Sequence, residues 1–102
     1  MQPSDLLDLV RTAYGLTSDY QLAKKFGFST AGVSMWRINR SFPKNSVLIQ
    51  FGKILQINAG VLMLHSLEWR EKDPEAKAQI SRLIEAIAHA KFDDSFYEEV
   101  EQ

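Results

Sequence analysis

Side chains that can bind phosphate groups and base edges gather in the N-terminal half of this chain. Hydroxyl and amide groups can hydrogen-bond to phosphate oxygens and to bases, and Lys and Arg add positive charge. Between Tyr20 and Leu67 the sequence holds six basic residues and no Asp or Glu. Residues 1–57 carry seven basic and three acidic side chains, a net charge of +4, whereas residues 58–102 carry five basic and ten acidic ones, a net charge of −5. The total charge of −1 therefore conceals a basic half suited to a polyanion.

The elements that must position these side chains start within residues 18–38, which read as two short helices joined by a tight turn. Ser18 is followed three residues later by Gln21, a spacing that predicts a capping box at the start of a helix over 19–26. Gly27 is expected to end this helix, because glycine tolerates the left-handed backbone found just past a helix C-terminus.

A second helix is expected over 30–38. Ser29 and Thr30 can cap it, because a hydroxyl oxygen accepts a hydrogen bond from an otherwise unpaired backbone N–H of the first turn. Val33 and Trp36 are spaced to face back toward the first helix, which predicts that both are core residues. The opposite side of such a helix can enter the major groove of DNA, with its N-terminal residues against base edges.

Residues 4–65 resemble the helix-turn-helix regulators of the Cro/CI type, a DNA-binding domain of phage repressors and bacterial regulators. The resemblance is carried by small and apolar positions of the motif: Leu22, Ala23, Phe26, Gly27, Phe28, Val33 and Trp36. The run WRINRSFPKNSVLIQFGKIL is similar to the tryptophan, basic turn, proline and fourth helix of the family. Asn39 stands where the family commonly has glycine, and asparagine is the next best residue for a left-handed backbone.

This resemblance implies a sequence-specific regulator that binds double-stranded DNA, of the type found in phages and prophages. Repression would be steric, because a protein that occupies an operator blocks the polymerase. The expectation that it represses rather than activates transcription rests on the resemblance alone and not on particular residues.

The geometry of the second motif helix divides the expected DNA contacts into two sets. The base-reading set comprises Ser29, Thr30, Ala31, Ser34 and Met35. The phosphate-contacting set comprises Thr17, Ser18, Tyr20, Gln21, Arg37, Arg40 and Lys44. Hydroxyl groups of the first set can hydrogen-bond bases, and its methyl groups and thioether suit thymine methyls. Lys24 and Lys25 are left open between a DNA contact and a solvated position.

Helical periodicity continues through the rest of the chain, and no alternating strand pattern competes with it. The expected helices cover 5–14, with Ser4 as its cap, then 19–26, 30–38, 45–56, 59–72 and 75–91. We therefore predict an all-α fold, namely a five-helix core of the Cro/CI repressor-like type with an additional C-terminal helix. Residues 1–57 would form the DNA-binding core, and residues 58–102 a helical extension that completes the core and ends in an acidic tail.

Other functional classes find little support in the composition. The chain has no cysteine, no apolar run long enough to span a membrane and no secretory leader pattern, so we expect a cytoplasmic protein. His65 and His89 have no partner at ligand spacing, which argues against a metal site. No catalytic motif is present, so we expect that the protein is not an enzyme. We also expect that it binds no cofactor and no small-molecule ligand.

Two questions stay open at this level. The apolar stripe of the last helix can pair with a second copy, which favours a homodimer, or it can fold back as the cap of a monomer. The alternative function is a helix-turn-helix module of the adaptor or antitoxin kind. Such a module would bind a protein partner through its acidic C-terminal half.

Overall fold

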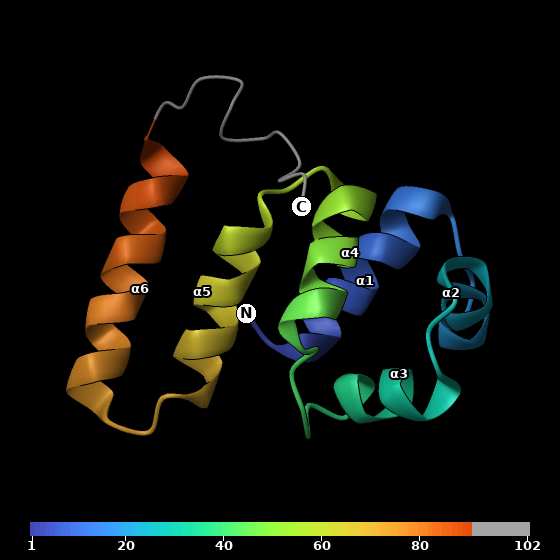
Figure 1. The fold of residues 1–102 in the computed structure, drawn as a ribbon, viewed down its shortest axis with the longest axis horizontal. Helices are drawn as coiled ribbons and strands as arrows, with labels where there is room; N and C mark the ends of the chain where they lie inside the picture. The colour runs from blue at the N-terminus through green and yellow to red at the C-terminus, as the bar shows by residue number, and fades with distance from the viewer. Residues whose placement is uncertain (91–102) are drawn as a thin grey trace. The chain divides into compact units, whose positions relative to one another are not determined.

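The computed structural model describes residues 1–90, and this part of the chain is helical without a strand (Figure 1). The helices are α1 (Pro3–Tyr14), α2 (Asp19–Phe26), α3 (Thr30–Arg37), α4 (Asn45–Leu55), α5 (Ala59–Arg70) and α6 (Pro74–His89). The all-α prediction is confirmed for these residues, and each expected helix is present with its ends shifted by a few residues. The expected acidic tail lies outside the described residues.

The chain divides into two compact units, one of residues 1–44 and one that begins at residue 45. The first unit contains α1, α2 and α3, which pack against one another, and in the second α5 packs against both α4 and α6. The division predicted after residue 57 follows the change in charge between the two halves of the chain rather than the packing of helices, and it stays a prediction.

Helix α1 begins earlier than predicted, and its cap is not Ser4. Proline is accepted at the first helical position, and α1 begins at Pro3 with Gln2 as its N-cap residue. The Asp5 carboxylate accepts a hydrogen bond from the Gln2 backbone N–H at 2.7 Å. Ser4 contributes through its backbone N–H, which donates to Oδ1 of Asn39 at 2.9 Å.

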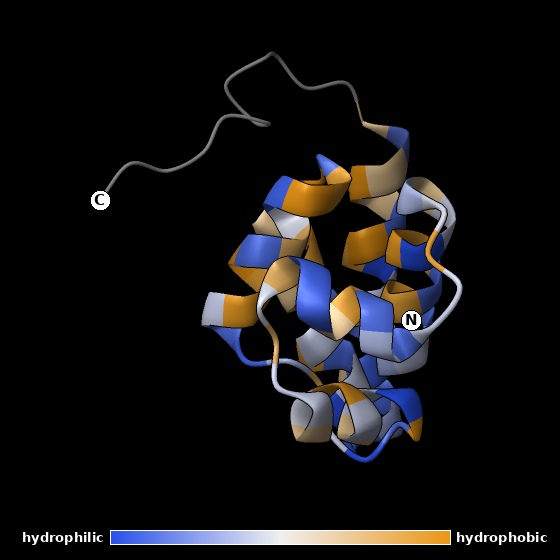
Figure 2. Cartoon of the chain, turned by 90° about the vertical axis from the view of Figure 1, so that its right-hand side faces the viewer, coloured by the Kyte–Doolittle hydropathy of each residue, from blue (hydrophilic) through white to orange (hydrophobic). Residues whose placement is uncertain are grey.

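The core of the first unit is apolar and closely packed. Its buried side chains include Leu6, Leu7, Val10, Leu22, Ala23, Val33 and Trp36. Trp36 is 8% exposed, so its predicted core position is confirmed. Aromatic rings continue the packing, with ring centroids 5.6 Å apart for Phe28 and Trp36 and 5.2 Å apart for Tyr14 and Phe26. Figure 2 shows the pattern behind this packing, because apolar and polar residues alternate around the helices.

Two of the helices of the second unit start at side-chain caps, and α4 lies very close to the start of α5 at one glycine. Asn58 caps α5 by accepting from the Gly60 N–H at 2.8 Å, and Asp73 caps α6 by accepting from the Glu75 N–H at 3.1 Å. The buried Gly52 of α4 lies against the backbone that enters α5. No residue of α6 is fully buried, although α6 packs against α5.

Two further observations bear on function. No helix among residues 1–90 combines the length and the apolar character needed to cross a membrane. Within the same residues, no group of three or more His, Asp or Glu side chains is placed to hold a metal ion.

Candidate nucleic-acid interface

Helices α2 and α3 are joined by a three-residue turn, Gly27 to Ser29. Gly27 has φ 75°, the left-handed backbone that the sequence predicts at the end of α2. The predicted capping box is confirmed in one half only. Ser18 Oγ accepts a hydrogen bond from the Gln21 N–H at 3.1 Å, but Gln21 Oε1 accepts from the N–H and the hydroxyl of Thr17, at 2.9 and 3.0 Å. These polar groups order the start of α2.

The outer face of α3 carries the residues that the sequence assigns to base edges. Ser29 caps the helix, because its hydroxyl oxygen accepts from the Gly32 N–H at 3.0 Å. All five members of the base-reading set, namely Ser29, Thr30, Ala31, Ser34 and Met35, are exposed. Val33 and Trp36 are buried on the opposite side of the helix. The first turn of α3 contains no acidic residue, so nothing there opposes the attraction of its N-terminus for an anion.

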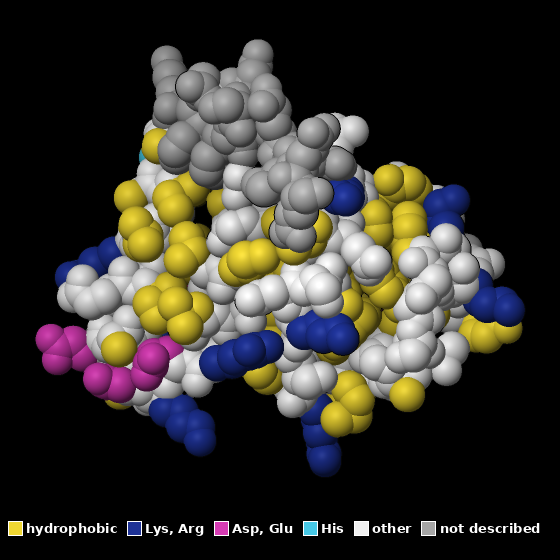
Figure 3. Space-filling view, viewed as in Figure 1, with side chains coloured by type: hydrophobic (Ala, Val, Ile, Leu, Met, Phe, Trp, Pro, Cys, Tyr) yellow, Lys and Arg dark blue, Asp and Glu magenta, His cyan; other side chains and the backbone are white. Residues whose placement is uncertain are grey.

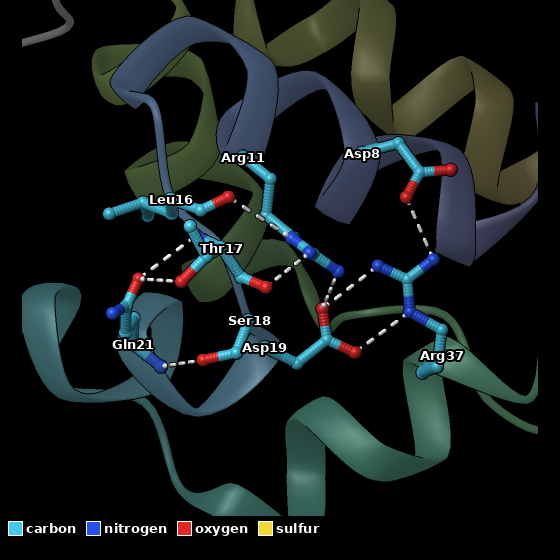
Figure 4. Close-up of polar contacts among 8 residues, drawn as sticks. All are labelled: Asp8, Arg11, Leu16, Thr17, Ser18, Asp19, Gln21 and Arg37. Atoms are coloured by element: carbon cyan, nitrogen blue, oxygen red, sulfur yellow. Dashed lines mark hydrogen bonds and ion pairs between the residues drawn. The ribbon is translucent and has the colours of Figure 1, made fainter.

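Arg37, at the end of α3, belongs to an ion-pair network inside the first unit (Figure 4). Its Nε and Nη2 donate to the two carboxylate oxygens of Asp19, each at 2.8 Å, and its Nη1 donates to Asp8 Oδ1 at 2.8 Å. Arg11 Nη1 lies 3.4 Å from Asp19 Oδ1, and its Nη2 donates to the Thr17 carbonyl at 2.7 Å. The network therefore joins α1, α2 and α3.

This network gives Arg37 a role inside the first unit. Its guanidinium is half-buried and directed at two carboxylates of that unit, so Arg37 helps to hold the fold together, and the phosphate contact expected of it stays a prediction. The hydrogen bonds from Arg37 hold the pKa of Asp19 below its ordinary value, and Asp19 in turn raises the pKa of Arg37. The sequence pattern cannot reveal this pairing, because the partners lie on different helices.

The lowered pKa of Asp19 predicts acid sensitivity. A carboxylate that is favoured in the folded state contributes its full stabilisation above the pKa of the unfolded chain, about 4 for Asp, and loses it as pH falls through the lower folded-state pKa. We expect Asp19→Asn to be less stable than the unsubstituted chain at neutral pH, with the difference shrinking below about pH 4. Thermal unfolding followed by circular dichroism across this range measures it. A difference that does not change with pH would contradict the assignment.

Four cations of the first unit take part in no ion pair within the described residues: Lys24, Lys25, Arg40 and Lys44. All four are exposed. In Figure 3, Lys and Arg side chains stand over α2 on the right of the view, where no acidic side chain is visible. The Lys24 ammonium lies 5.8 Å from the ring centroid of the exposed Tyr20, a cation–π contact that leaves the charge at the surface.

Arg40 owes its position to the end of α3. Asn39 has φ 58°, which confirms the left-handed backbone predicted for it. The following residue turns back, and the Arg40 N–H donates to the Met35 carbonyl at 3.0 Å. Arg40 therefore extends from the C-terminal end of the helix that carries the base-reading set. Sequence reasoning missed Ile38, which is 60% exposed and follows Ser34 by one helical turn.

A second polar cluster lies between α5 and α6. The Ser81 hydroxyl donates to Glu68 Oε2, and this bond lowers the pKa of Glu68. Burial lowers the pKa of His65, whose Nδ1 is buried without a hydrogen-bond partner among the described residues. These groups connect two helices of the second unit.

Comparisons with protein-family models, with curated proteins and with solved structures find no match to this chain. A role for the surface around α3 must therefore be argued from its own chemistry. That surface combines an exposed, uncharged helix face, a helix N-terminus without acidic residues and four cations that form no ion pair with any of residues 1–90.

Proposed function

We propose that this chain is a sequence-specific regulator of transcription that binds double-stranded DNA with a helix-turn-helix of the Cro/CI type. Its fold would be the five-helix repressor-like core with an added C-terminal helix, and it would act in the cytoplasm as a phage-type repressor that occupies an operator. The observation that carries the proposal is the outer face of α3, which is exposed and uncharged and has surface cations on the elements around it. This combination suits a helix that enters a groove between two rows of phosphates.

Each part of the surface has a role in this proposal. Thr30 and Ser34 would hydrogen-bond base edges from the first turns of α3. Arg40 and Lys44 would contact phosphates beyond the end of α3. The start of α2, with the side chains of Thr17, Ser18, Tyr20 and Gln21, would approach the backbone of the duplex, because hydroxyl and amide groups can hydrogen-bond phosphate oxygens. In this proposal Lys24 and Lys25 are added to the phosphate-contacting set, and Arg37 is removed from it.

Binding to DNA should weaken steeply as salt rises, because each phosphate contact releases condensed counterions. We expect Arg40→Ala to lower affinity for every duplex sequence and to reduce the slope of log K against log salt by about 0.9. Fluorescence anisotropy with a random duplex measures both. Lys72→Ala is the matched control, since it removes an equal charge from the exposed start of the α5–α6 turn. A slope near zero for the unsubstituted chain would contradict DNA binding.

The proposal includes a homodimer. One reading helix with five small or apolar residues makes few strong base contacts, and two copies on neighbouring half-sites double them. The α5–α6 pair offers apolar side chains for pairing, because Leu67 is 52% exposed and Leu83 is 50% exposed. Apolar residues also show over this pair on the left of Figure 3.

Replacement of both Leu67 and Leu83 by glutamine is expected to convert the dimer to a monomer without unfolding it, because both side chains are half exposed within one copy. Sedimentation velocity measures the change. Ala78→Gln, on the other side of α6, should leave the dimer intact. A monomeric unsubstituted chain at micromolar concentration would contradict the proposal.

The second candidate function is a protein-interaction module. It is favoured by the acidic residues where α5 turns into α6, among them Glu71, Asp73 and Glu75, which lie close in sequence to the exposed Leu67. In Figure 3 acidic side chains gather at this end of the second unit. A module of this kind would bind a basic partner through the second unit, and its first unit would show no salt-dependent affinity for duplex DNA.

A further inference from the structure

The outer face of α3 is unusual in its chemistry for a base-reading surface. It consists of Thr30, Ala31, Ser34 and Met35, together with Ile38 at the end of the helix. None of these side chains carries an amide, a guanidinium or a carboxylate, the groups that make bidentate contacts with guanine and adenine or accept from cytosine. What they offer instead is methyl groups, one thioether and two hydroxyls.

These residues form one continuous stripe. Thr30, Ser34 and Ile38 follow one another at intervals of four, and Ala31 and Met35 lie beside them at the same interval, as on one side of an α-helix. Ile38 is the C-cap residue of α3, and its backbone N–H still donates to the Ser34 carbonyl at 3.2 Å, so it continues the stripe just past the last helical residue.

The apolar part of the stripe faces solvent. Met35 is 41% exposed and Ile38 is 60% exposed, and both belong to the small set of large apolar side chains on the surface of the described chain. Apolar atoms gain most from a partner that also buries apolar surface. In the major groove the one apolar group on a base edge is the C5-methyl of thymine, or the same methyl on a modified cytosine.

We propose that the outer face of α3 recognises C5-methyl groups of pyrimidines in the major groove, and that thymine-rich half-sites are therefore its preferred targets. This inference rests on the proposed function and names the chemistry that the same site reads. Met35 and Ile38 cover the methyl groups, while Thr30 and Ser34 hydrogen-bond neighbouring base edges. Arg40, two residues after Ile38, contacts a phosphate beside the covered bases.

The decisive experiment removes the methyl groups from the DNA and leaves the base pairing unchanged. A duplex selected from a random pool is prepared with thymine or with deoxyuridine at each position, and its Kd is measured by fluorescence anisotropy. We expect Kd to rise by about threefold to fivefold for each methyl that α3 covers, and the salt dependence to stay the same. At such a position a pair of 5-methylcytosine with guanine should bind more tightly than unmodified cytosine with guanine, which separates the methyl from the rest of thymine.

Variants of the protein assign the effect to α3. Ile38→Ala and Met35→Ala should reduce the difference between thymine and deoxyuridine, and thermal unfolding should show that these surface changes leave the fold intact. Leu9→Ala is the matched control, because Leu9 is a large apolar residue of α1 that is 43% exposed and lies outside the stripe.

The outcomes separate the inference from the function on which it rests. Salt-dependent duplex binding that is indifferent to deoxyuridine at every position would overturn methyl recognition and would leave DNA binding in place. No duplex binding at low salt would overturn the proposed function and this inference together.

Discussion

Replacement of Arg37 by alanine is expected to lower the free energy of unfolding of the first unit by about 2 kcal/mol. The change removes the two 2.8 Å hydrogen bonds to Asp19 and the one to Asp8. Asp19, whose side chain is 27% exposed, would keep only the longer contact with Arg11 at 3.4 Å. A partly buried carboxylate without its main partner loses more than a surface ion pair would, because it has given up part of its hydration.

Urea unfolding followed by circular dichroism measures this loss, and a double-mutant cycle attributes it. The coupling of Arg37 with Asp19 should exceed that with Asp8, because Asp19 binds through two bonds, whereas Asp8 is 61% exposed and binds through one. Arg40→Ala, the removal of an exposed arginine, should leave stability within about 0.5 kcal/mol. An equally small effect of Arg37→Ala would refute its structural role.

The same pair of arginines separates folding from DNA binding. At a temperature at which the Arg37→Ala chain is still folded, its salt dependence on DNA should match that of the unsubstituted chain. Arg40→Ala should show the opposite pattern, with normal stability and a reduced salt slope. Arg37 links the end of α3 to α1 and α2, so under the proposed function it would act only by holding the outer face of α3 in position.

Replacement of Gly52 by alanine is expected to destabilise the second unit by about 1–2 kcal/mol, although alanine is the better helix former by about 1 kcal/mol. A Cβ at this position would lie 2.8 Å from the Ile57 carbonyl oxygen and 3.2 Å from the Ala59 Cβ. The carbonyl belongs to the backbone just after α4, where the Ile57 N–H donates to the Gly52 carbonyl at 2.9 Å. The obstacle therefore cannot rotate away.

The sign of the Gly52→Ala effect is the test, since helix propensity and packing predict opposite changes. Urea unfolding of the purified variant measures it. Gln50→Ala, at an exposed position of the same helix, provides the control and should change stability by less than about 0.5 kcal/mol. A more stable Gly52→Ala chain would show that α4 and the start of α5 can separate without cost.

Local signals in the sequence predicted most of the helix ends. Gly27 and Asn39 adopt the left-handed backbone expected of them, and Asn58 and Asp73 cap the helices that follow them. Each of these residues acts on backbone groups within a few positions, so its effect depends little on the rest of the fold. The first helix was the exception, because proline at its first position displaced the predicted start from Ser4 to Pro3.

At the candidate interface, too, the sequence predicted some features and the tertiary structure decided others. Helical spacing alone predicted which side of α3 is buried, because Val33 and Trp36 are apolar and three residues apart, as on one face of a helix. The same spacing could not assign Arg37, whose long side chain suits a phosphate and a carboxylate equally well. Its role was decided by Asp8 and Asp19, which arrive from two other helices.

The sequence by itself thus determined the helices, most of their ends and the uncharged face of α3, because these follow from interactions between residues close along the chain. Only the tertiary structure decided that Arg37 pairs with Asp19, that Gly52 must lack a side chain and that α4 belongs with α5. Those features depend on which surfaces meet after folding. Contacts between different elements leave no periodic signal in a single chain, whether the residues are far apart, as Asp19 and Arg37 are, or only a few positions apart, as Gly52 and Ile57 are.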